Sequence, residues 1–429
     1  MQENKVLTGR VGEYEALDLE AYKALDGLQG LEQAISMNPG SVIDQIKQSG
    51  LTGRGGAGFP EGLKWETAAK EKKYPKYFIC NADEGELGTY KDKVLLDGDP
   101  WAVLEGILIA AYAIGAQQAY IYIKGEYDQT FKLWEKLAVE AESAGLLGEK
   151  ILGSKLSVSL NVVKGRGPYI AGEEFALISS LEARRPMGRL KPPYPTERGL
   201  FGRPTVVNNV ETIANAPVIL AKGPREYRNL GAEDDPGTRL FSLSGDVKQQ
   251  GVYELEMGSG TMRELIDEFG KGTPHGRPVK AVQPGGGTST LIAGDSLDCL
   301  LTTKAIRKAG SSIGTAGVIV YEDSKSALDI VRGLLEFYGH ESCGRCSPCR
   351  IGVVKMKEIV DRLSCGEGTI NDLSQLREIG KASVAVSTCG MGQAFPLPVL
   401  SALELFPEDF NAAVHKTTAK KFDRGAVRQ

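Results

Sequence analysis

The sequence predicts an α/β fold that is followed by a smaller mixed module and a helical bundle, on three observations. Short apolar runs alternate with helical stretches between residues 76 and 163, an order typical of β–α–β units around a parallel sheet. The composition changes at residues 231–237 (GAEDDPG), which indicates a linker. From residue 324 onward, apolar residues recur at helical spacing, which predicts the bundle.

The elements before the linker follow one another in a regular order. Helical spacing in YKALDGLQGLEQAI and SVIDQIKQSG predicts that residues 1–50 are helical. After a glycine loop come the expected strands KYFIC, AYIYI and LSVSLNVV, with helices over residues 101–115 and 127–144 between them. Ligands of such sheets bind beyond the carboxyl ends of the strands. NADEGELGT follows the first strand and KGRGPYIAGEE follows the third, so we expect a ligand near both motifs.

The elements after the linker are of two kinds. Residues 240–321 mix short strands with one helix around residues 262–269 and the turn PGGGTST, which indicates a small α+β module. The bundle is expected from four stretches with helical apolar spacing: ALDIVRGLLEFY, IGVVKMKEIVDRL, LSQLREIGKAS and VLSALELF.

Composition and charge exclude several classes of protein. The chain has 429 residues, 41% of them hydrophobic and 25% charged, and a formal net charge of −4, which gives no reason to expect nucleic acid or an anionic membrane as a partner. The acidic N-terminus lacks the pattern of a signal peptide, so we expect a cytoplasmic protein. Residues 106–116 are the most apolar stretch but are shorter than the roughly 20 residues of a membrane helix. We therefore expect a buried core helix there, no direct membrane insertion, and any peripheral membrane association only through partner subunits.

The cysteines predict a metal centre. Three of the seven crowd into ESCGRCSPCR: Cys343, Cys346 and Cys349. This C-x-x-C-x-x-C spacing allows one loop to ligate three corners of a cubane iron–sulfur cluster, and a distant cysteine supplies the fourth corner. Cys365 and Cys389 are both candidates, and the glycines near Cys389 favour it because they permit close backbone approach. The alternative is a zinc site that His340 or a later cysteine completes, although zinc sites more often use two separated pairs.

The loop LTGRGGAGFPEGLKW, residues 51–65, contains the G-x-G-x-x-G spacing of a dinucleotide-binding turn. Such a turn must leave a strand and open a helix, so that the helix N-terminus faces the pyrophosphate. Here helical residues precede the loop, and Pro60 and Gly62 interrupt any helix that begins at Gly58. The required context is therefore missing on both sides.

The same loop still has the parts of an anion site. Five glycines permit close backbone approach, Arg54 and Lys64 carry positive charge, and Phe59 and Trp65 offer stacking surfaces. A solvated surface loop is the alternative interpretation.

Two acidic motifs carry polar groups toward the same region. NADEGELGT packs its acids into one turn, and KGRGPYIAGEE adds a tyrosine and two glutamates. Buried acids are costly unless they accept hydrogen bonds from a ligand or from the backbone, whereas for any single acid a solvated loop is the default. The residues concerned are Asp83, Glu84, Glu86, Tyr169, Glu173 and Glu174.

Six motifs in order closely resemble the NADH-binding flavoprotein subunit of respiratory complex I and its relatives: GRGGAGFPEGLKW, CNADEGELGTYKD, GPYIAGEEFALISSLE, KPPYP, PTVVNNVET and ESCGRCSPCR. The match runs from about residue 51 to residue 406. It implies FMN and one [4Fe–4S] cluster as cofactors and NADH as substrate, with hydride passing to the flavin and electrons leaving singly through the cluster. The implied domains are a helical segment (1–50), a Rossmann-like FMN/NADH-binding domain (51–236), a ubiquitin-like or β-grasp module (237–323) and a helical bundle with the cluster (324–429).

The resemblance also implies site residues. Those expected to hold the flavin are Gly53, Arg54, Gly55, Gly56, Lys64, Asn81, Asp83, Glu84, Tyr169, Gly172, Glu173, Asn208, Asn209 and Thr212. The nicotinamide nucleotide would stack on the flavin near Phe59, Glu86, Glu174, Lys191 and Tyr194. The cluster would be held by Cys343, Cys346, Cys349 and Cys389. Since the flavin carries the hydride chemistry, no catalytic side chain is assigned, although Glu86 lies nearby. Glu174 would accept from the adenosine 2′-hydroxyl and repel the 2′-phosphate of NADPH.

The chain departs from the usual respiratory pattern at Gly85, Leu87 and Thr67, where a serine, a proline and an adenine-flanking aromatic are common. The NADEG form is similar to the homologous subunits of NAD-linked hydrogenases, formate dehydrogenases and electron-bifurcating complexes, which are the alternative to complex I. We expect electrons to leave through separate partners, a thioredoxin-like iron–sulfur subunit and a larger iron–sulfur subunit. The hypothesis from another class is a non-catalytic scaffold with structural zinc, whose central module binds a saccharide or a partner.

Overall fold

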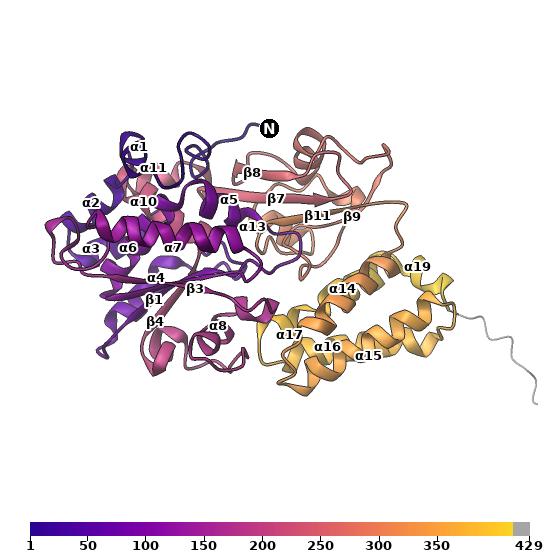
Figure 1. Ribbon diagram of the computed structural model, residues 1–429. Helices are drawn as coiled ribbons and strands as arrows, with labels where there is room; N and C mark the ends of the chain where they lie inside the picture. Colours follow the sequence, from indigo (N-terminus) through magenta and orange to yellow (C-terminus); the bar gives the residue numbers. More distant parts are fainter. Residues whose placement is uncertain (415–429) are drawn as a thin grey trace, which may run out of the picture.

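The first part of the chain is built on a four-stranded sheet, as the computed structural model of residues 1–414 shows (Figure 1). Its strands are β1 (Tyr77–Ala82), β2 (Gln118–Ile123), β3 (Ser159–Lys164) and β4 (Thr205–Asn209). All pairings are parallel and the order is β3-β2-β1-β4. The parallel sheet and its first three strands confirm the prediction, whereas β4 is a strand that the sequence did not predict. The strand order reverses between β1 and β4, which is where sheets of this kind bind ligands.

Helices cover both faces of this sheet. Phe78 and Cys80 of β1 point into the core that contains α6, while Tyr77 and Ile79 point into the core that contains α8, as the period of two in a strand requires. The helices are α1 (Leu19–Ala24), α2 (Gln29–Ser36), α3 (Pro39–Ser49), α4 (Glu61–Lys70), α5 (Lys91–Gly98), α6 (Pro100–Ile114), α7 (Asp128–Ser143), α8 (Glu174–Leu181), α9 (Pro195–Arg198), α10 (Val210–Lys222) and α11 (Pro224–Arg228). Short 3-10 turns lie at Ile151–Gly153, Tyr169–Gly172 and Leu200–Gly202.

The apolar stretch at residues 106–116 contains the second half of α6, which ends at Ile114 and is buried on nearly every side. This confirms the predicted core helix. No helix within residues 1–414 is both long enough and apolar enough to cross a membrane.

The N-terminal region differs from the prediction. Residues 1–18 form no helix, and the Glu254 carboxylate accepts from the amides of Leu7 and Thr8 at 2.9 Å each. Arg10 then pairs with Asp99 at 2.9 Å, beside the start of α6. The helices α2 and α3 share one core with the first sheet. The first fifty residues are therefore part of the same packed unit as the sheet.

A second sheet follows the predicted linker, which forms a small hairpin. The hairpin strands are β5 (Gly231–Ala232) and β6 (Asp235–Pro236). The second sheet has the order β10-β9-β11-β7-β8, with only β11 and β7 parallel. Its elements are β7 (Thr238–Gly245), β8 (Gly251–Glu256), α12 (Met262–Glu264), the turn Leu265–Phe269, β9 (Val279–Gln283), β10 (Ile292–Ala293), the turn Gly294–Ser296, α13 (Thr303–Lys308) and β11 (Gly317–Glu322).

The last part of the described chain is helical and lies beside both sheets (Figure 1). Its helices are α14 (Ala327–Glu341), α15 (Ser347–Ser364), α16 (Ile370–Val386), α17 (Gly390–Ala394), α18 (Leu397–Leu405) and α19 (Pro407–Ala412). Their apolar faces form a separate core in which Leu335, Met356 and Phe395 are fully buried. The remaining part of the expected 324–429 region, residues 415–429, lies outside the described residues.

Candidate functional site

The glycine loop, residues 51–60, is a closed turn that connects α3 to α4. Thr52 pairs with Pro60 as an isolated bridge, and the amide of Gly53 donates to the carbonyl of Phe59 at 2.9 Å. These contacts close the base of the loop, while its middle is exposed to solvent. The loop therefore has a defined shape with an accessible centre.

The amides in the middle of this loop are free. Those of Gly55, Gly56 and Ala57 donate to no other group within residues 1–414. Gly56 has φ of +120°, a conformation that favours glycine. Gly55 lies so close to β4 that a Cβ would be 2.9 Å from the Cβ of Asn209. Successive free amides form a concavity that suits an anion, so the loop can accept a phosphate beside β4.

The flanks of the loop only partly agree with the prediction. A helix precedes it, as expected, so the glycine spacing is not a dinucleotide turn. No helix begins at Gly58, as expected, but α4 begins at Glu61 and runs through Gly62, so the prediction that no helix follows the loop is wrong. Pro60 precedes the first turn, where proline is tolerated, and Gly62 allows α4 to approach α3, since a Cβ would be 2.7 Å from the amide nitrogen of Lys47.

The Arg54 side chain points away from the loop, so the prediction that its charge contributes to an anion site in the loop is wrong. Its guanidinium is fully buried, donates to the carbonyls of Pro236 at 3.0 Å and Thr238 at 3.3 Å, and lies 3.9 Å from Asp235. Its backbone amide donates to Thr212 Oγ1 at 2.7 Å. The charge of Arg54 therefore ties the loop to the linker and to the second sheet.

Trp65 is also not a stacking surface, because it is fully buried. Its Nε1 donates to Asn208 Oδ1 at 3.0 Å, and Asn208 Nδ2 donates to Glu61 at 2.6 Å. Lys64 is only half-buried, and its Nζ lies 3.2 Å from the carbonyl of Val207 on β4. Lys64, in the first turns of the following helix α4, therefore brings a positive charge to the edge strand β4.

A buried polar network fixes the end of β4. Asn209 caps α10 through its Oδ1, which accepts from the Glu211 amide at 3.1 Å, and its Nδ2 donates to Asp92 at 2.6 Å. Lys91, which is fully buried, pairs with Asp92 at 2.7 Å and with Glu211 at 2.8 Å. Glu84 accepts from the Asp92 amide at 2.8 Å, at the N-terminus of α5. These backbone donors offset only part of the effect of burial, which raises the pKa of Glu84 to about 7.

The acid turn, residues 81–89, begins at the carboxyl end of β1. Asn81 donates to the carbonyl of Gly172 at 2.9 Å, and a Cβ on Gly172 would be 3.0 Å from the carbonyl of Asp83. Burial raises the pKa of Asp83 to about 7, and its Oδ2 has no hydrogen-bond partner among the described residues. A buried oxygen of this kind indicates a donor that the protein itself does not supply.

The raised pKa of Asp83 predicts a pH dependence of stability. The folded chain binds this proton more tightly than the unfolded chain, so the contribution to stability is full below about pH 4 and is lost as the pH rises toward about 7. The free energy of unfolding should therefore fall by up to roughly 4 kcal/mol over this pH range, and Asp83→Asn should abolish that decrease. Urea unfolding at several pH values measures it, and the exposed Asp295→Asn variant serves as control. An equal slope in both variants would contradict the assignment.

Glu86 and Tyr169 join the acid turn to the motif after β3. The Tyr169 hydroxyl donates to Glu86 Oε2 at 2.6 Å, and the Tyr169 amide donates to Glu341 of α14 at 2.7 Å. Gly85 allows this packing, because a Cβ there would be 3.1 Å from the Tyr169 ring. Burial raises the pKa of Glu86 and outweighs its hydrogen bonds.

The residues expected near the nicotinamide nucleotide divide into an ion pair cluster and two exposed rings. Lys191 pairs with Glu174 and lies 3.5 Å from Glu173, whose carboxylate also caps α8. Phe59 and Tyr194 are each about half exposed. Exposed aromatic rings such as these are available to a planar ligand.

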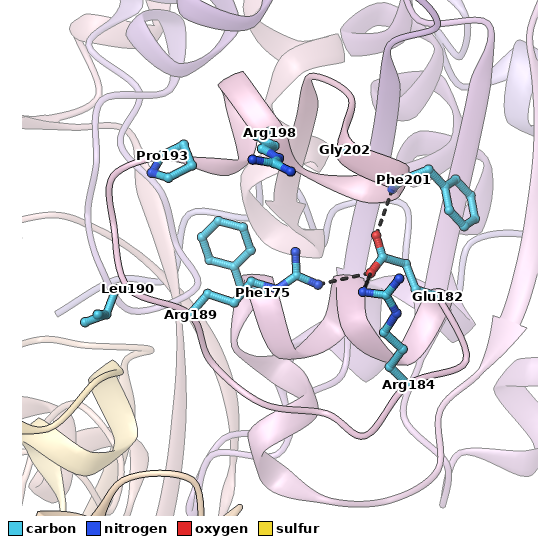
Figure 2. Close-up of a pocket in the computed structure, with 9 residues that line it drawn as sticks. All are labelled: Phe175, Glu182, Arg184, Arg189, Leu190, Pro193, Arg198, Phe201 and Gly202. Atoms are coloured by element: carbon cyan, nitrogen blue, oxygen red, sulfur yellow. Dashed lines mark hydrogen bonds and ion pairs between the residues drawn. The ribbon is translucent and has the colours of Figure 1, made fainter.

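A cavity of about 540 Å³ is lined in part by Arg189, Leu190 and Pro193 (Figure 2). Two of its three arginines are engaged with Glu182: Arg189 pairs with it at 3.0 Å and lies over the Phe175 ring at 5.3 Å, and Arg184 lies 3.6 Å from it. The sequence did not indicate this cavity. Its contacts hold the loop in place.

The structure brings four cysteines together at one end of the C-terminal helices: Cys343, Cys346, Cys349 and Cys389. Cys346 and Cys389 are the N-cap residues of α15 and α17. Burial and the neighbouring sulfurs raise the pKa of Cys349 to about 11. A Cβ on Gly392 would be 3.2 Å from that of Cys349, so α17 approaches the triplet closely. Four sulfurs from one loop and one distant helix suit a cubane cluster.

The alternative ligands do not join this group. Cys365 is exposed at the C-terminal end of α15, about 27 Å along the helix from its start, and His340 is exposed on α14. Within the described chain, no three His, Cys, Asp or Glu side chains converge closely enough to hold a single metal ion.

Comparisons with known proteins agree with this geometry. Residues 46–218 match the family model for the Nuo51 FMN-binding domain, and residues 329–413 match the NADH-ubiquinone oxidoreductase-F iron–sulfur binding region. The chain is 41% identical to a subunit of the NADH-quinone oxidoreductase of Rhizobium meliloti over 93% of this chain and 94% of that protein. The chain belongs to the Nuo51 family of NADH-quinone oxidoreductase subunits. It thus has an FMN-binding domain and a [4Fe–4S]-binding region and is an NADH-binding oxidoreductase subunit, as the motifs predicted.

The Nuo51 family extends beyond respiratory enzymes. The chain is 38% identical to the NADP-reducing hydrogenase subunit HndC of Solidesulfovibrio fructosivorans over 96% of this chain and 83% of that one. A crystal structure of NAD+-reducing [NiFe]-hydrogenase in the H2-reduced state superposes with a TM-score of 0.84 and 31% identity, covering 97% of this chain and 68% of that chain. The mixed α/β fold is shared with that structure.

The site contains residues that sequence reasoning missed. The sequence indicates the turn PGGGTST only as part of the central module, yet the amide of its Thr288 donates to Glu86 at 3.0 Å. Lys91, Asp92 and Glu211 were not expected at the end of β4. All three lie inside motifs that carry the resemblance, CNADEGELGTYKD and PTVVNNVET, but nothing in the sequence shows that the two motifs meet at one buried network.

Proposed function

We propose that this chain takes hydride from NADH onto FMN and passes electrons singly to a [4Fe–4S] cluster, as in NADH:quinone oxidoreductase. One observation supports this proposal most directly. The carboxyl ends of β1 and β4 bring together the free amides of the glycine loop, the acid turn and the Asp83 oxygen that has no partner among the described residues. These groups fit a ligand with a phosphate and polar ring edges. When bound, FMN supplies hydride acceptance and one-electron transfer, so the chain's task is binding and orientation.

The flavin proposal assigns most residues by their backbone or by a single polar atom. The amides of Gly55 to Ala57 and the Lys64 ammonium would hold the phosphate, and Asp83 would accept from the ring system. Arg54 would contribute only its backbone. The remaining proposed contacts are Gly53, Asn81, Glu84, Tyr169, Gly172, Glu173, Asn208, Asn209 and Thr212. The side chains of Asn208, Asn209 and Thr212 form hydrogen bonds with other residues of the protein. We therefore infer that they shape the site.

The nicotinamide nucleotide would stack on the flavin, with Phe59 and Tyr194 as exposed apolar walls. Glu86 would accept from its polar groups. Lys191 pairs with Glu174 and so would orient that carboxylate toward the adenosine ribose. The proposed cluster ligands are Cys343, Cys346, Cys349 and Cys389.

We propose the domain division 51–236, 237–323 and 324–429 for the Rossmann-like flavin domain, a β-grasp module and a cluster-bearing bundle. β7 begins at Thr238 and α14 begins at Ala327, which supports these boundaries. Residues 1–50 pack into the core of the flavin domain and are better joined to it.

The second candidate is the equivalent subunit of an NAD-linked hydrogenase or another NAD-linked complex, because the relatives named above include hydrogenase subunits. In either case we propose a multi-subunit assembly, with a thioredoxin-like iron–sulfur protein and a larger iron–sulfur protein as electron acceptors. We propose a cytoplasmic location for it. Proteins that co-purify with the chain distinguish the two candidates.

Anaerobic purification tests the proposed function directly. We expect a yellow-brown protein whose flavin absorption bleaches when NADH is added. A colourless protein that contains zinc would contradict it and support the scaffold hypothesis.

Coenzyme choice tests the role of Glu174. Glu174→Gln keeps the side chain's shape but removes the charge that opposes a 2′-phosphate, so the ratio of kcat/KM for NADPH to that for NADH should rise about tenfold. The exposed Glu135→Gln variant on α7 is the control. An unchanged ratio would place Glu174 away from the ribose.

A further inference from the structure

The glycine turn PGGGTST, residues 284–290, belongs to the second sheet and connects β9 to β10. It lies outside both ranges that the family models match, 46–218 and 329–413. The turn nevertheless reaches the first sheet's acid turn, whose Glu86 is proposed to face the nicotinamide nucleotide. A segment without an assigned role therefore forms part of the wall of the proposed site.

The glycine turn holds one oxygen of Glu86. The Thr288 amide donates to Glu86 Oε1 at 3.0 Å, while the Tyr169 hydroxyl donates to Oε2 at 2.6 Å. The two donors come from different parts of the chain, so the carboxylate is oriented from both sides. The Thr288 side chain also lies toward this carboxylate, so the turn holds it through more than one group.

The turn also fixes the stem of the Glu86 side chain. Gly286 has φ of +92°, and a Cβ there would meet Glu86 Cδ at 2.9 Å and its Cγ at a still shorter distance. The amide of Gly287 donates to the carbonyl of Leu87 at 3.2 Å. Glu86 thus has no room to adopt another rotamer toward the second sheet.

We propose that residues 284–290 are a positioning element of the NADH site, which orients the Glu86 carboxylate through the Thr288 amide and through close contact at Gly286. This inference rests on the proposed function. Ribose hydroxyls and the carboxamide of the nicotinamide nucleotide are hydrogen-bond donors, and an acceptor held in advance binds them without the cost of ordering a long side chain. The second sheet then contributes to NADH affinity as well as to packing.

The test compares two glycine variants of the assembled, flavin-loaded complex. Gly286→Ala should raise the KM for NADH about tenfold and leave kcat with ferricyanide within about twofold, because it displaces a group that binds substrate and does not react. Gly276→Ala is the matched control, since Gly276 also has positive φ, at +68°, in the same module but has nothing within 4 Å. FMN content and the cluster spectrum should stay unchanged in both.

A double-mutant cycle separates positioning from general packing. Glu86→Ala removes the atoms that the new Cβ would meet, so adding Gly286→Ala to it should change KM less than about twofold. An equal tenfold rise in both backgrounds would overturn the proposal. If the original protein does not oxidise NADH at all, the proposed function fails instead, and the two failures are distinct.

A milder variant covers the case in which Gly286→Ala does not assemble. A Cβ on Gly287 would lie 3.0 Å from Leu87 and from the Tyr338 hydroxyl, a contact that small movements of the turn can relieve. Gly287→Ala should raise KM about threefold and lose that effect in the Glu86→Ala background. An unchanged KM with full FMN content would overturn the proposal.

Discussion

Cys389→Ser should abolish most of the cluster's absorbance and its electron paramagnetic resonance signal. A serine hydroxyl is a harder and weaker ligand than a thiolate, and Cys389, at the N-terminus of α17, is the proposed fourth ligand. Electron transfer to acceptors beyond the cluster should fall by more than about tenfold. NADH should still bleach the flavin, because serine is close to cysteine in size and leaves the neighbouring Glu173 in place.

Cys365→Ser is the matched control for this result. Cys365 is the other candidate from sequence spacing, and it is exposed at the far end of α15. Its replacement should leave the iron content and the spectrum unchanged. Loss of the cluster in Cys365→Ser, with retention in Cys389→Ser, would reverse the assignment.

Gly55→Ala should weaken FMN binding about tenfold or more, since it closes the space between the loop and β4. The new Cβ would lie 2.9 Å from the Cβ of Asn209. Asn209 cannot move aside easily, because it caps α10 and donates to Asp92 at 2.6 Å. The loop must shift instead, and its free amides shift with it. Flavin per polypeptide after purification, and FMN titration of the flavin-free protein, measure the loss.

Gly333→Ala is the control for a glycine change as such. Gly333 lies within α14 and has nothing within 4 Å, so alanine should be accepted and should add slightly to helix stability. Its FMN content should equal that of the original protein. Normal FMN affinity in Gly55→Ala would show that the phosphate does not bind at this loop.

The parallel sheet was predictable where strands are continuous apolar runs, as in KYFIC and AYIYI. β4 was not predicted, because its apolar run is short and ends in the polar residues Asn208 and Asn209. Asn209 caps α10, and both residues lie at the candidate site. Periodicity predicts helix for residues 1–18 together with their neighbours, yet these residues are held by Glu254 and Asp99, far away in sequence. Periodicity reports local structure only and cannot reveal such contacts.

The site residues divide in the same way. The motifs identified the glycine loop, the acid turn and the cysteine triplet, because each is a local pattern whose chemistry follows from residue type and spacing. They could not show that the Arg54 charge points into the interior or that Trp65 is buried. The direction of a side chain depends on the residues it packs against. The partners of Arg54 are in the linker hairpin and at the start of β7.

The sequence by itself determined the chemistry: a cubane-type cysteine set, a glycine loop suited to phosphate, and the order of motifs that places the chain in its family. Only the tertiary structure decided which groups are free to act. It brings Cys389 to the triplet, leaves the amides of Gly55 to Ala57 without a partner among residues 1–414, and sets Thr288 against Glu86, 202 positions earlier in the chain. Spacing acts over a few residues, whereas these contacts arise where separately formed cores pack together.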